Sequence, residues 1–291
     1  MTLSVAIIGS GVIGMDLLNK ISRSPLLNCS LLVGRNKESI GLKVAANLGI
    51  KTDIDGIDAI LASPKPFDVV FDATNAPSHA KHCELLRPLD TLLIDLTPSH
   101  LGKMIVPTVT GSDVINERNV SLISCGGQAS IPILHALSRN FQINDIEVVS
   151  TVASKSVGRA TRINIDEYVE TTQLALRYFT GVENIKAILN ISPADPAIIF
   201  RVTIFASIVG ANIEQVTSIT NQAVESVRSF SSGYSLKGVK MSEERVSIFL
   251  DVVANSDVLP PYAGNLDIIN SAAILVAEQY ANYKKKKSEY K

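Results

Sequence analysis

The chain begins with a short apolar run that leads directly into three closely spaced glycines. Val5-Ala-Ile-Ile8 is apolar at every position, which is typical of a parallel strand buried on both faces. Gly9, Gly11 and Gly14 follow with the spacing Gly-x-Gly-x-x-Gly, ahead of a segment with helical periodicity. The first glycine of such a motif permits a tight turn, the second lets a pyrophosphate approach the backbone, and the third brings helix and strand together. The segment predicts a βαβ unit whose helix N-terminus binds dinucleotide phosphates.

Strand-like and helical segments alternate after this unit. Strands are expected at 30–33, 67–71 and 91–94, and the composition of 38–48 is that of a helix. Strands that alternate with helices form βαβ units, so the pattern predicts a doubly wound parallel sheet of the Rossmann type.

The pattern changes after about residue 145. Strands are expected at 146–152, 186–191 and 201–206, helices at 165–178 and 213–229, and a terminal helix at 267–283. A chain of 291 residues exceeds what one hydrophobic core usually accommodates. We therefore predict an α/β protein in which 1–124 and 267–291 form the Rossmann domain, with the C-terminal helix packing back on it. Residues 125–266 should form an α+β domain, with a mixed or antiparallel sheet, for catalysis and oligomerisation.

The charge balance argues against one class of partner. Lys and Arg total 27 against 28 Asp and Glu, a formal net charge of −1, which leaves no basic face for nucleic acid. No apolar run reaches the roughly 20 residues that a membrane span needs. The N-terminus has no positively charged region before its apolar run, so we expect no signal peptide and a cytoplasmic location. The three cysteines include no C-x-x-C pair, which suits a reducing compartment.

The residues after the second apolar run bear on which dinucleotide is bound. An acidic residue about 20 positions after the glycine motif usually binds the adenosine ribose. Here that region reads Gly34-Arg-Asn-Lys37, and the first carboxylate is Glu38. Arg35 and Lys37 could face a 2′-phosphate, which predicts use of NADP as well as NAD. The alternative is that Arg35 stacks on adenine or points to solvent while Asn36 binds the ribose.

Cys125 is the candidate nucleophile. It lies where an apolar strand gives way to Gly126-Gly127 and then to a helical segment. At a helix start, unpaired N–H groups and the helix dipole are expected to lower the pKa of a thiol, and the flanking glycines leave room for substrate and offer donors to an oxyanion. Cys29 and Cys83 lack this setting and are expected to be small buried hydrophobic residues.

No histidine partner for this cysteine is evident. His135 lies ten residues further along the same helical segment, about 15 Å away, and cannot pair with Cys125 locally. His79 and His82 are three residues apart, but no carboxylate or cysteine cluster completes a metal site, so we expect both on a helix surface and predict no metal.

Several motifs together resemble a known family, the acylating acetaldehyde dehydrogenases of aromatic meta-cleavage pathways. These are distant relatives of the glyceraldehyde-phosphate and aspartate-semialdehyde dehydrogenases. The resemblance covers nearly the whole chain and rests on the segments 5–11, 70–74, 93–98, 124–128, 153–158, 164–167 and 262–268.

The resemblance implies a two-step reaction. Cys125 would add to a short aldehyde, a hydride would pass to NAD or NADP, and coenzyme A would release the acyl group from a thioester. Further cofactor contacts are implied at Ser10, Val12, Ile13, Ser156, Gly158, Asn164 and Asn265. A homo-oligomer is expected, with a 4-hydroxy-2-oxovalerate aldolase as the partner that delivers acetaldehyde.

The chain departs from the family pattern in three places. Alignment on Pro193-Ala-Asp-Pro196 and Arg201 puts Val202 where the family has an aspartate that could assist thiol activation. The family's Gly-Pro-Gly loop reads Gly158-Arg-Ala160 here, and 233–259 is shorter than expected. An alternative is therefore a cofactor-binding paralogue with weak or no catalysis, acting as a subunit or regulator. A third possibility is that phosphate, not coenzyme A, cleaves the thioester.

Overall fold

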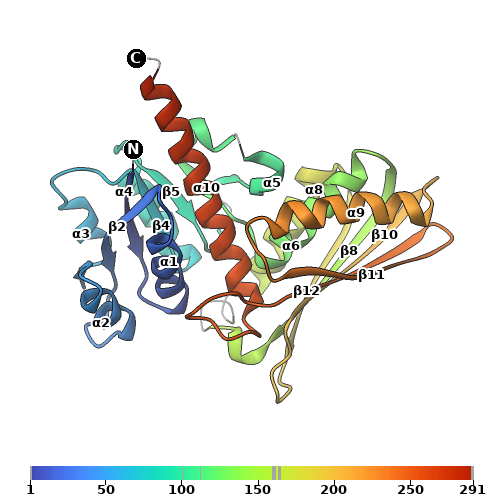
Figure 1. The fold of residues 1–291 in the computed structure, drawn as a ribbon, viewed down its shortest axis with the longest axis horizontal. Coiled ribbons are helices and arrows are strands. Elements are labelled where there is room, and N and C mark those ends of the chain that lie inside the picture. Colours follow the sequence, from blue (N-terminus) through green and yellow to red (C-terminus); the bar gives the residue numbers. More distant parts are fainter. Residues whose placement is uncertain (1, 100, 112, 159–161, 163–164, 290–291) are drawn as a thin grey trace. The chain divides into compact units, whose positions relative to one another are not determined.

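The computed structural model describes residues 2–99, 101–111, 113–158, 162 and 165–289. The chain divides into two compact units, Met1–Leu122 with Asn270–Lys291, and Ile123–Ile269. Figure 1 shows the elements of each. No helix in these described ranges is both long and apolar enough to cross a membrane.

The first unit is built on a seven-stranded sheet of order β3-β2-β1-β4-β5-β7-β6. Every strand pair in it is parallel, as the glycine motif and the alternating pattern predicted. The strands are β1 (Leu3–Ile8), β2 (Leu27–Val33), β3 (Lys51–Asp53), β4 (Val69–Asp72), β5 (Leu92–Asp95), β6 (Lys103–Met104) and β7 (Asn119–Ser121). The helices are α1 (Val12–Ser22), α2 (Ile40–Asn47), α3 (Ile57–Leu61), α4 (Ala76–Leu86) and α5 (Pro107–Thr110), with a 3₁₀ turn at Asp113–Asn116.

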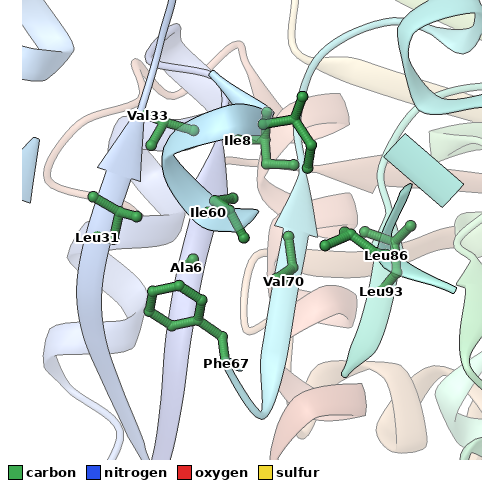
Figure 2. Close-up of a cluster of buried hydrophobic side chains, with 10 residues drawn as sticks. Ala6, Ile8, Leu31, Val33, Ile60, Phe67, Val70, Leu86 and Leu93 are labelled. Atoms are coloured by element: carbon green, nitrogen blue, oxygen red, sulfur yellow. The ribbon is translucent and has the colours of Figure 1, made fainter. Parts of the chain in front are cut away.

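Side chains from alternate positions of the central strands form one buried cluster, shown in Figure 2. Ala6 and Ile8 of β1 contribute to it, as do Leu31 and Val33 of β2, because residues two apart share one face of a sheet. The remaining members come from β4, β5, α3, α4 and the loop before β4: Ile57, Ile60, Phe67, Val70, Leu86 and Leu93. Burial of aliphatic side chains on this scale, at about 1.5–3 kcal/mol each, fixes the strand ends that carry the functional residues.

The C-terminal helix α10 (Gly264–Glu289) packs against the first unit along its later turns, as predicted. Asn270 Nδ2 donates to Asp16 on α1 at 2.6 Å, and Lys284 pairs with Asp68 at 2.9 Å. Two short strands, β3 and β6, were not predicted, since β3 consists of polar and charged residues and β6 has only two residues, Lys103 and Met104.

The second unit has a five-stranded mixed sheet of order β11-β12-β10-β8-β9. Its strands are β8 (Gln142–Ala153), β9 (Asn184–Ser192), β10 (Phe200–Val209), β11 (Tyr234–Ser242) and β12 (Arg245–Val252). Its helices are α6 (Cys125–Ser138), α8 (Ile165–Thr180) and α9 (Ile213–Arg228), with a 3₁₀ turn at Ser154–Ser156. Only β8 and β9 pair in parallel. The prediction of a mixed or antiparallel sheet is confirmed.

One face of this sheet is covered by α6, α8 and α9, which lie on the same side of the strands in Figure 1. Val202, Ile204, Ile248 and Leu250 point toward these helices and are buried. The hairpin of β11 and β12 was not predicted. β11 has few aliphatic residues, whereas β12, with Val246, Ile248 and Leu250 at alternate positions, does carry the pattern of a strand.

Candidate active site

A cavity of about 780 Å³ lies at the carboxyl ends of the strands of the first unit, where open α/β sheets bind ligands. Its lining comes from the glycine loop, the end of β2, the loop from β3 to α3, and the start of α4. The lining residues include Gly9, Ser10, Gly11, Arg35, Asn36, Asp55, Asp58, Lys81 and His82.

The glycine loop has the geometry that its spacing predicted. Gly9 has φ of +117°, and a Cβ there would lie 2.5 Å from the carbonyl oxygen of Ala73, so only glycine fits. A Cβ on Gly14 would collide with the carbonyl oxygen of Gly9, which is the close helix–strand contact expected of the third glycine. Gly11 has open space where its Cβ would be, and so leaves a cradle in front of the N-terminus of α1.

The other predicted residues of this loop take different places. Ser10 lines the cavity, and its hydroxyl accepts a hydrogen bond from Ser39 at 2.8 Å. Val12 and Ile13 form the first turn of α1. The carbonyl oxygen of Ile13 accepts a hydrogen bond from Asn270.

Charged groups of both signs face the cavity. Arg35 lines it, whereas Lys37 lines a separate shallow hollow, so the two cations do not act together. Asp55 and Asp58 also line the cavity. They follow β3, a strand that was not predicted, and for this reason the sequence pattern did not connect them with the ribose side of a dinucleotide.

His79 and His82 are buried, and their expected place on a helix surface is wrong. Asn75 caps α4 by accepting a hydrogen bond from the Ser78 N–H. The helix that begins there places His79 and His82 on its face toward the end of β4. Nδ1 of His79 and Nδ1 of His82 then both lie against one oxygen of Asp72, at 2.9 Å and 2.8 Å. His82 lines the cavity, whereas His79 lies wholly inside the protein.

The carboxylates at the ends of β4 and β5 have opposite protonation tendencies. Burial opposes ionisation of Asp72, yet hydrogen bonds from His79, His82 and Thr74 overcome it and lower its pKa to about 2. Burial dominates at Asp95 and raises its pKa to about 6, although Ser99 and the Thr97 N–H donate to it. His79 lies 3.5 Å from Asp95, and the pKa of its imidazole is raised by the two carboxylates against the effect of burial. No group of three His, Cys, Asp or Glu residues suited to a metal ion occurs in the described ranges.

Cys125 is the first residue of α6, as its position between strand and glycines predicted. Ser124 caps the helix by accepting a hydrogen bond from the Gly127 N–H at 2.9 Å, and Thr172 of α8 holds the Ser124 hydroxyl at 2.7 Å. The preceding residue, Ile123, has φ of +68°, a conformation that costs a β-branched residue about 1–3 kcal/mol. The turn that presents the cysteine is therefore held in place by the packing around it.

The expected lowering of the thiol pKa is wrong. Burial raises the pKa of Cys125 to about 11, and the N–H groups of Cys125 and Gly126 only partly oppose this effect. The phenol of Tyr168 on α8 also lowers the thiol pKa. In the resting thiol, the Cys125 S–H donates to Tyr168 Oη at 3.7 Å. Tyr168 lies 43 residues from Cys125 along the chain, and no local pattern pointed to it.

Three more predicted cofactor residues fall in the described part of the second unit. Ser156 is buried, and its carbonyl oxygen accepts a hydrogen bond from Asn265 Nδ2 at 3.5 Å. Asn265 Oδ1 is buried and has no hydrogen-bond partner among the residues that the structure describes. Gly158 is exposed. Asn164 lies outside the described residues.

The other cysteines and His135 stand apart from Cys125. Cys29 is buried, and burial raises its pKa to about 11, in line with a small hydrophobic residue. Cys83 is only half-buried, and Asn119 Nδ2 lies 3.3 Å from its sulfur. His135 binds the carbonyl oxygen of Phe179 through Nδ1 at 2.8 Å.

Several known proteins with similar sequences are acetaldehyde dehydrogenases. The family profile for prokaryotic acetaldehyde dehydrogenase, dimerisation, matches residues 125–260. The acetaldehyde dehydrogenase of Streptomyces griseus is 57% identical, over 96% of this chain and 91% of its own. Those of Pectobacterium atrosepticum and Spirochaeta aurantia are 44% and 43% identical, each over 96% of this chain and 95% of its own.

A solved structure shares the fold. The crystal structure of aspartate semialdehyde dehydrogenase II from Vibrio cholerae, complexed with ASA, matches with a TM-score of 0.69 at 12% identity, over 97% of this chain and 99% of the other. The identities to the named relatives, over nearly full length on both sides, decide the family. The chain belongs to the acetaldehyde dehydrogenase family.

Proposed function

We propose that the protein oxidises acetaldehyde, or another short aldehyde, to the corresponding acyl-CoA with NAD or NADP as acceptor. The observation that carries this proposal is the placement of Cys125 at the first turn of α6, beside its own N–H group and that of Gly126. Membership of the family supports catalysis over the alternative of a non-catalytic paralogue.

In the first step Cys125 Sγ bonds to the aldehyde carbon, and the electron pair of the carbonyl bond moves to oxygen. The N–H groups of Cys125 and Gly126 have no helical acceptor at the start of α6 and are suited to bind that oxygen. Because burial holds the thiol pKa at about 11, the sulfur is protonated at neutral pH, and its proton passes to the aldehyde oxygen as the carbon–sulfur bond forms.

The nicotinamide, when bound, accepts the hydride that converts the adduct into a thioester. The cavity of the first unit fits the adenosine and pyrophosphate parts of such a cofactor. Gly11 leaves its cradle open at a helix N-terminus, and Arg35, Asp55 and Asp58 offer groups for the ribose or a 2′-phosphate. The resemblance alone supports a cofactor contact at Asn265, which belongs to the second unit. In the second step the CoA thiol attacks the thioester, and Cys125 leaves.

A second copy of the chain is the partner that the fold supports best. The face of the second sheet opposite α6, α8 and α9 carries the half-buried Phe205 and Phe249, among charged residues such as Arg245. The matched family profile is one of dimerisation, and we assign that role to this face. Phe249→Glu should convert a dimer into a monomer in sedimentation, and an unchanged mass would exclude the face.

The resemblance also suggests a 4-hydroxy-2-oxovalerate aldolase that supplies acetaldehyde in aromatic catabolism. Co-purification of an added aldolase with the protein tests this partner, and separate elution of the two would argue against it.

The test of the reaction is CoA-dependent formation of reduced nicotinamide from a panel of short aldehydes. Cys125→Ser should abolish this activity because a hydroxyl is a much weaker nucleophile than a thiol. The variant should remain folded because the two groups have nearly the same volume. Cys83→Ser serves as the matched control and should retain activity. Mass spectrometry after incubation with acetyl-CoA should find the acyl group on Cys125. Acyl label on Cys29 or Cys83, with an active Cys125→Ser protein, would refute the assignment.

The same assay separates the phosphate alternative. Replacement of CoA by phosphate should give no turnover, whereas phosphate-dependent turnover would favour an acyl phosphate product.

A further inference from the structure

A chain of hydroxyl groups leads from the sheet of the second unit to the sulfur of Cys125. Tyr168 of α8 is 6% exposed, and its Oη lies 3.7 Å from Cys125 Sγ. Ser150 of β8 is also buried, and its hydroxyl hydrogen-bonds to the Tyr168 phenol. The Tyr168 hydroxyl thus lies next to the sulfur of the proposed nucleophile, and Ser150 holds that hydroxyl by a hydrogen bond.

The position of the phenol is closely fixed. Thr172, one helical turn after Tyr168, donates to the Tyr168 carbonyl oxygen at 2.6 Å and also contacts Ser124, the cap of α6. A Cβ on Gly126 would collide with Ser150 Oγ and would lie 2.5 Å from Tyr168 Oη. The absence of a side chain at position 126 is therefore what lets the two hydroxyls reach the start of α6.

The other groups around the sulfur are uncharged or apolar, so the Tyr168 hydroxyl is important for the thiolate. Among the described residues, the groups that favour the thiolate of Cys125 are Tyr168 and the N–H groups of Cys125 and Gly126, and none of these is charged. Val202 lies opposite Ser150 in the pairing of β8 with β10 and is fully buried, so β10 brings an apolar side chain to this point. In the described part of the chain, the hydroxyl of Tyr168 is the side-chain donor directed at the thiol.

We propose that Tyr168 is a catalytic residue whose hydroxyl donates a hydrogen bond to the Cys125 sulfur as the thiol proton passes to the aldehyde oxygen, and that Ser150 is a positioning residue that orients the phenol. This inference rests on the proposed role of Cys125 as nucleophile. In the resting thiol the S–H donates to Oη, and in the thiolate the phenol O–H turns to donate to sulfur. Tyr168 keeps its own proton throughout, because burial and the neighbouring sulfur raise its pKa well above the ordinary value of 10.

The direction of the effect separates this role from a merely structural one. Loss of the hydrogen bond would make the thiolate rarer and slow its reactions. A variant that simply loosened the site would let water reach the sulfur, lower the thiol pKa and speed them.

The experiment measures the rate at which iodoacetamide alkylates Cys125, resolved by peptide mass spectrometry from Cys29 and Cys83. At pH 8, Tyr168→Phe should slow alkylation of Cys125 about tenfold, since one hydrogen bond to a charged group corresponds to roughly one pKa unit or more. Ser150→Ala should change the rate in the same direction and less. Tyr178→Phe removes a phenol hydroxyl from the exposed side of the same helix and should leave the rate unchanged. In turnover assays, kcat/KM should fall for Tyr168→Phe with most of the loss in kcat.

A rate within twofold of wild type for folded Tyr168→Phe, or a faster one, would overturn the inference. If that variant does not fold, Ser150→Ala takes its place, with a threefold fall in rate in support and an unchanged rate against. The proposed function is tested separately by acyl labelling. Label on Cys125 together with an unaffected Tyr168→Phe protein would refute only the role of Tyr168, whereas an active Cys125→Ser protein would refute the proposed function itself.

Discussion

The carboxylate of Asp72 accepts a hydrogen bond from Nδ1 of His79 at 2.9 Å, and neither side chain is exposed to solvent. The same oxygen also binds His82, and the other oxygen accepts from Thr74. One carboxylate at the end of β4 thus orders two imidazoles of α4, of which His82 faces the dinucleotide cavity.

Asp72→Asn should lower the free energy of unfolding by about 3–5 kcal/mol, because it leaves two buried imidazoles without their carboxylate. Urea denaturation measures the change. The matched control is Asp90→Asn, which removes an exposed carboxylate that pairs with Arg118, and it should cost less than about 1 kcal/mol. Equal effects of the two substitutions would show that the buried network contributes little to stability.

Asp95 and His79 should make the first unit less stable as the pH rises. Asp95 has a folded pKa of about 6 against the ordinary 3.8, so between these pH values its carboxyl ionises in the unfolded chain but stays protonated in the folded protein. The free energy of unfolding should therefore fall by up to about 3 kcal/mol as the pH rises through this range. The raised pKa of His79 acts in the same direction, since its stabilising contribution is present below about 6.5 and is lost as the pH rises through its folded pKa. Denaturation at a series of pH values should show Asp95→Asn losing the decline between about pH 4 and 6. An unchanged decline in the variant would rule out Asp95 as its cause.

Arg35→Ala should weaken use of NADP selectively, because Arg35 lines the cavity and can contact a 2′-phosphate. We expect kcat/KM with NADP to fall about tenfold or more, with little change for NAD. Lys37→Ala is the matched control and should affect neither cofactor, since Lys37 lines a separate hollow. A wild-type preference for NAD over NADP of a hundredfold, about 2.7 kcal/mol, would mean that Asp55 and Asp58 dominate over Arg35.

Val202→Asp should raise the turnover number with acetaldehyde and CoA, if a carboxylate at this position assists the thiol. Val202 is fully buried opposite Ser150, so the new carboxylate would be desolvated, and it should also reduce the free energy of unfolding. General acid–base assistance is typically worth about 10²–10⁴-fold, and we expect only part of that gain. Turnover at several pH values, with a check of folding, measures it. Fast wild-type turnover with no gain at any pH would mean that another group already fills the role.

The sequence by itself determined the features that depend on neighbouring residues. The spacing of Gly9, Gly11 and Gly14 directly after an apolar run was enough to identify the βαβ unit, because the tight turn and the helix start lie next to each other in the chain. Ser124, Cys125 and Gly127 are adjacent, so the capped helix start with a cysteine at its first position could be predicted from the chain alone. The parallel sheet followed from apolar runs that are buried on both faces.

Tertiary structure alone decided the charge state and the partners of the reactive groups. The environment of His79 depends on Asp72, Asp95 and Asn119, which three separate strands bring together, and no spacing along the chain records it. Tyr168 reaches Cys125 across 43 residues of sequence. The thiol pKa is high because burial outweighs the nearby donors, and burial is a property of the packed protein that no segment of the chain has when taken separately.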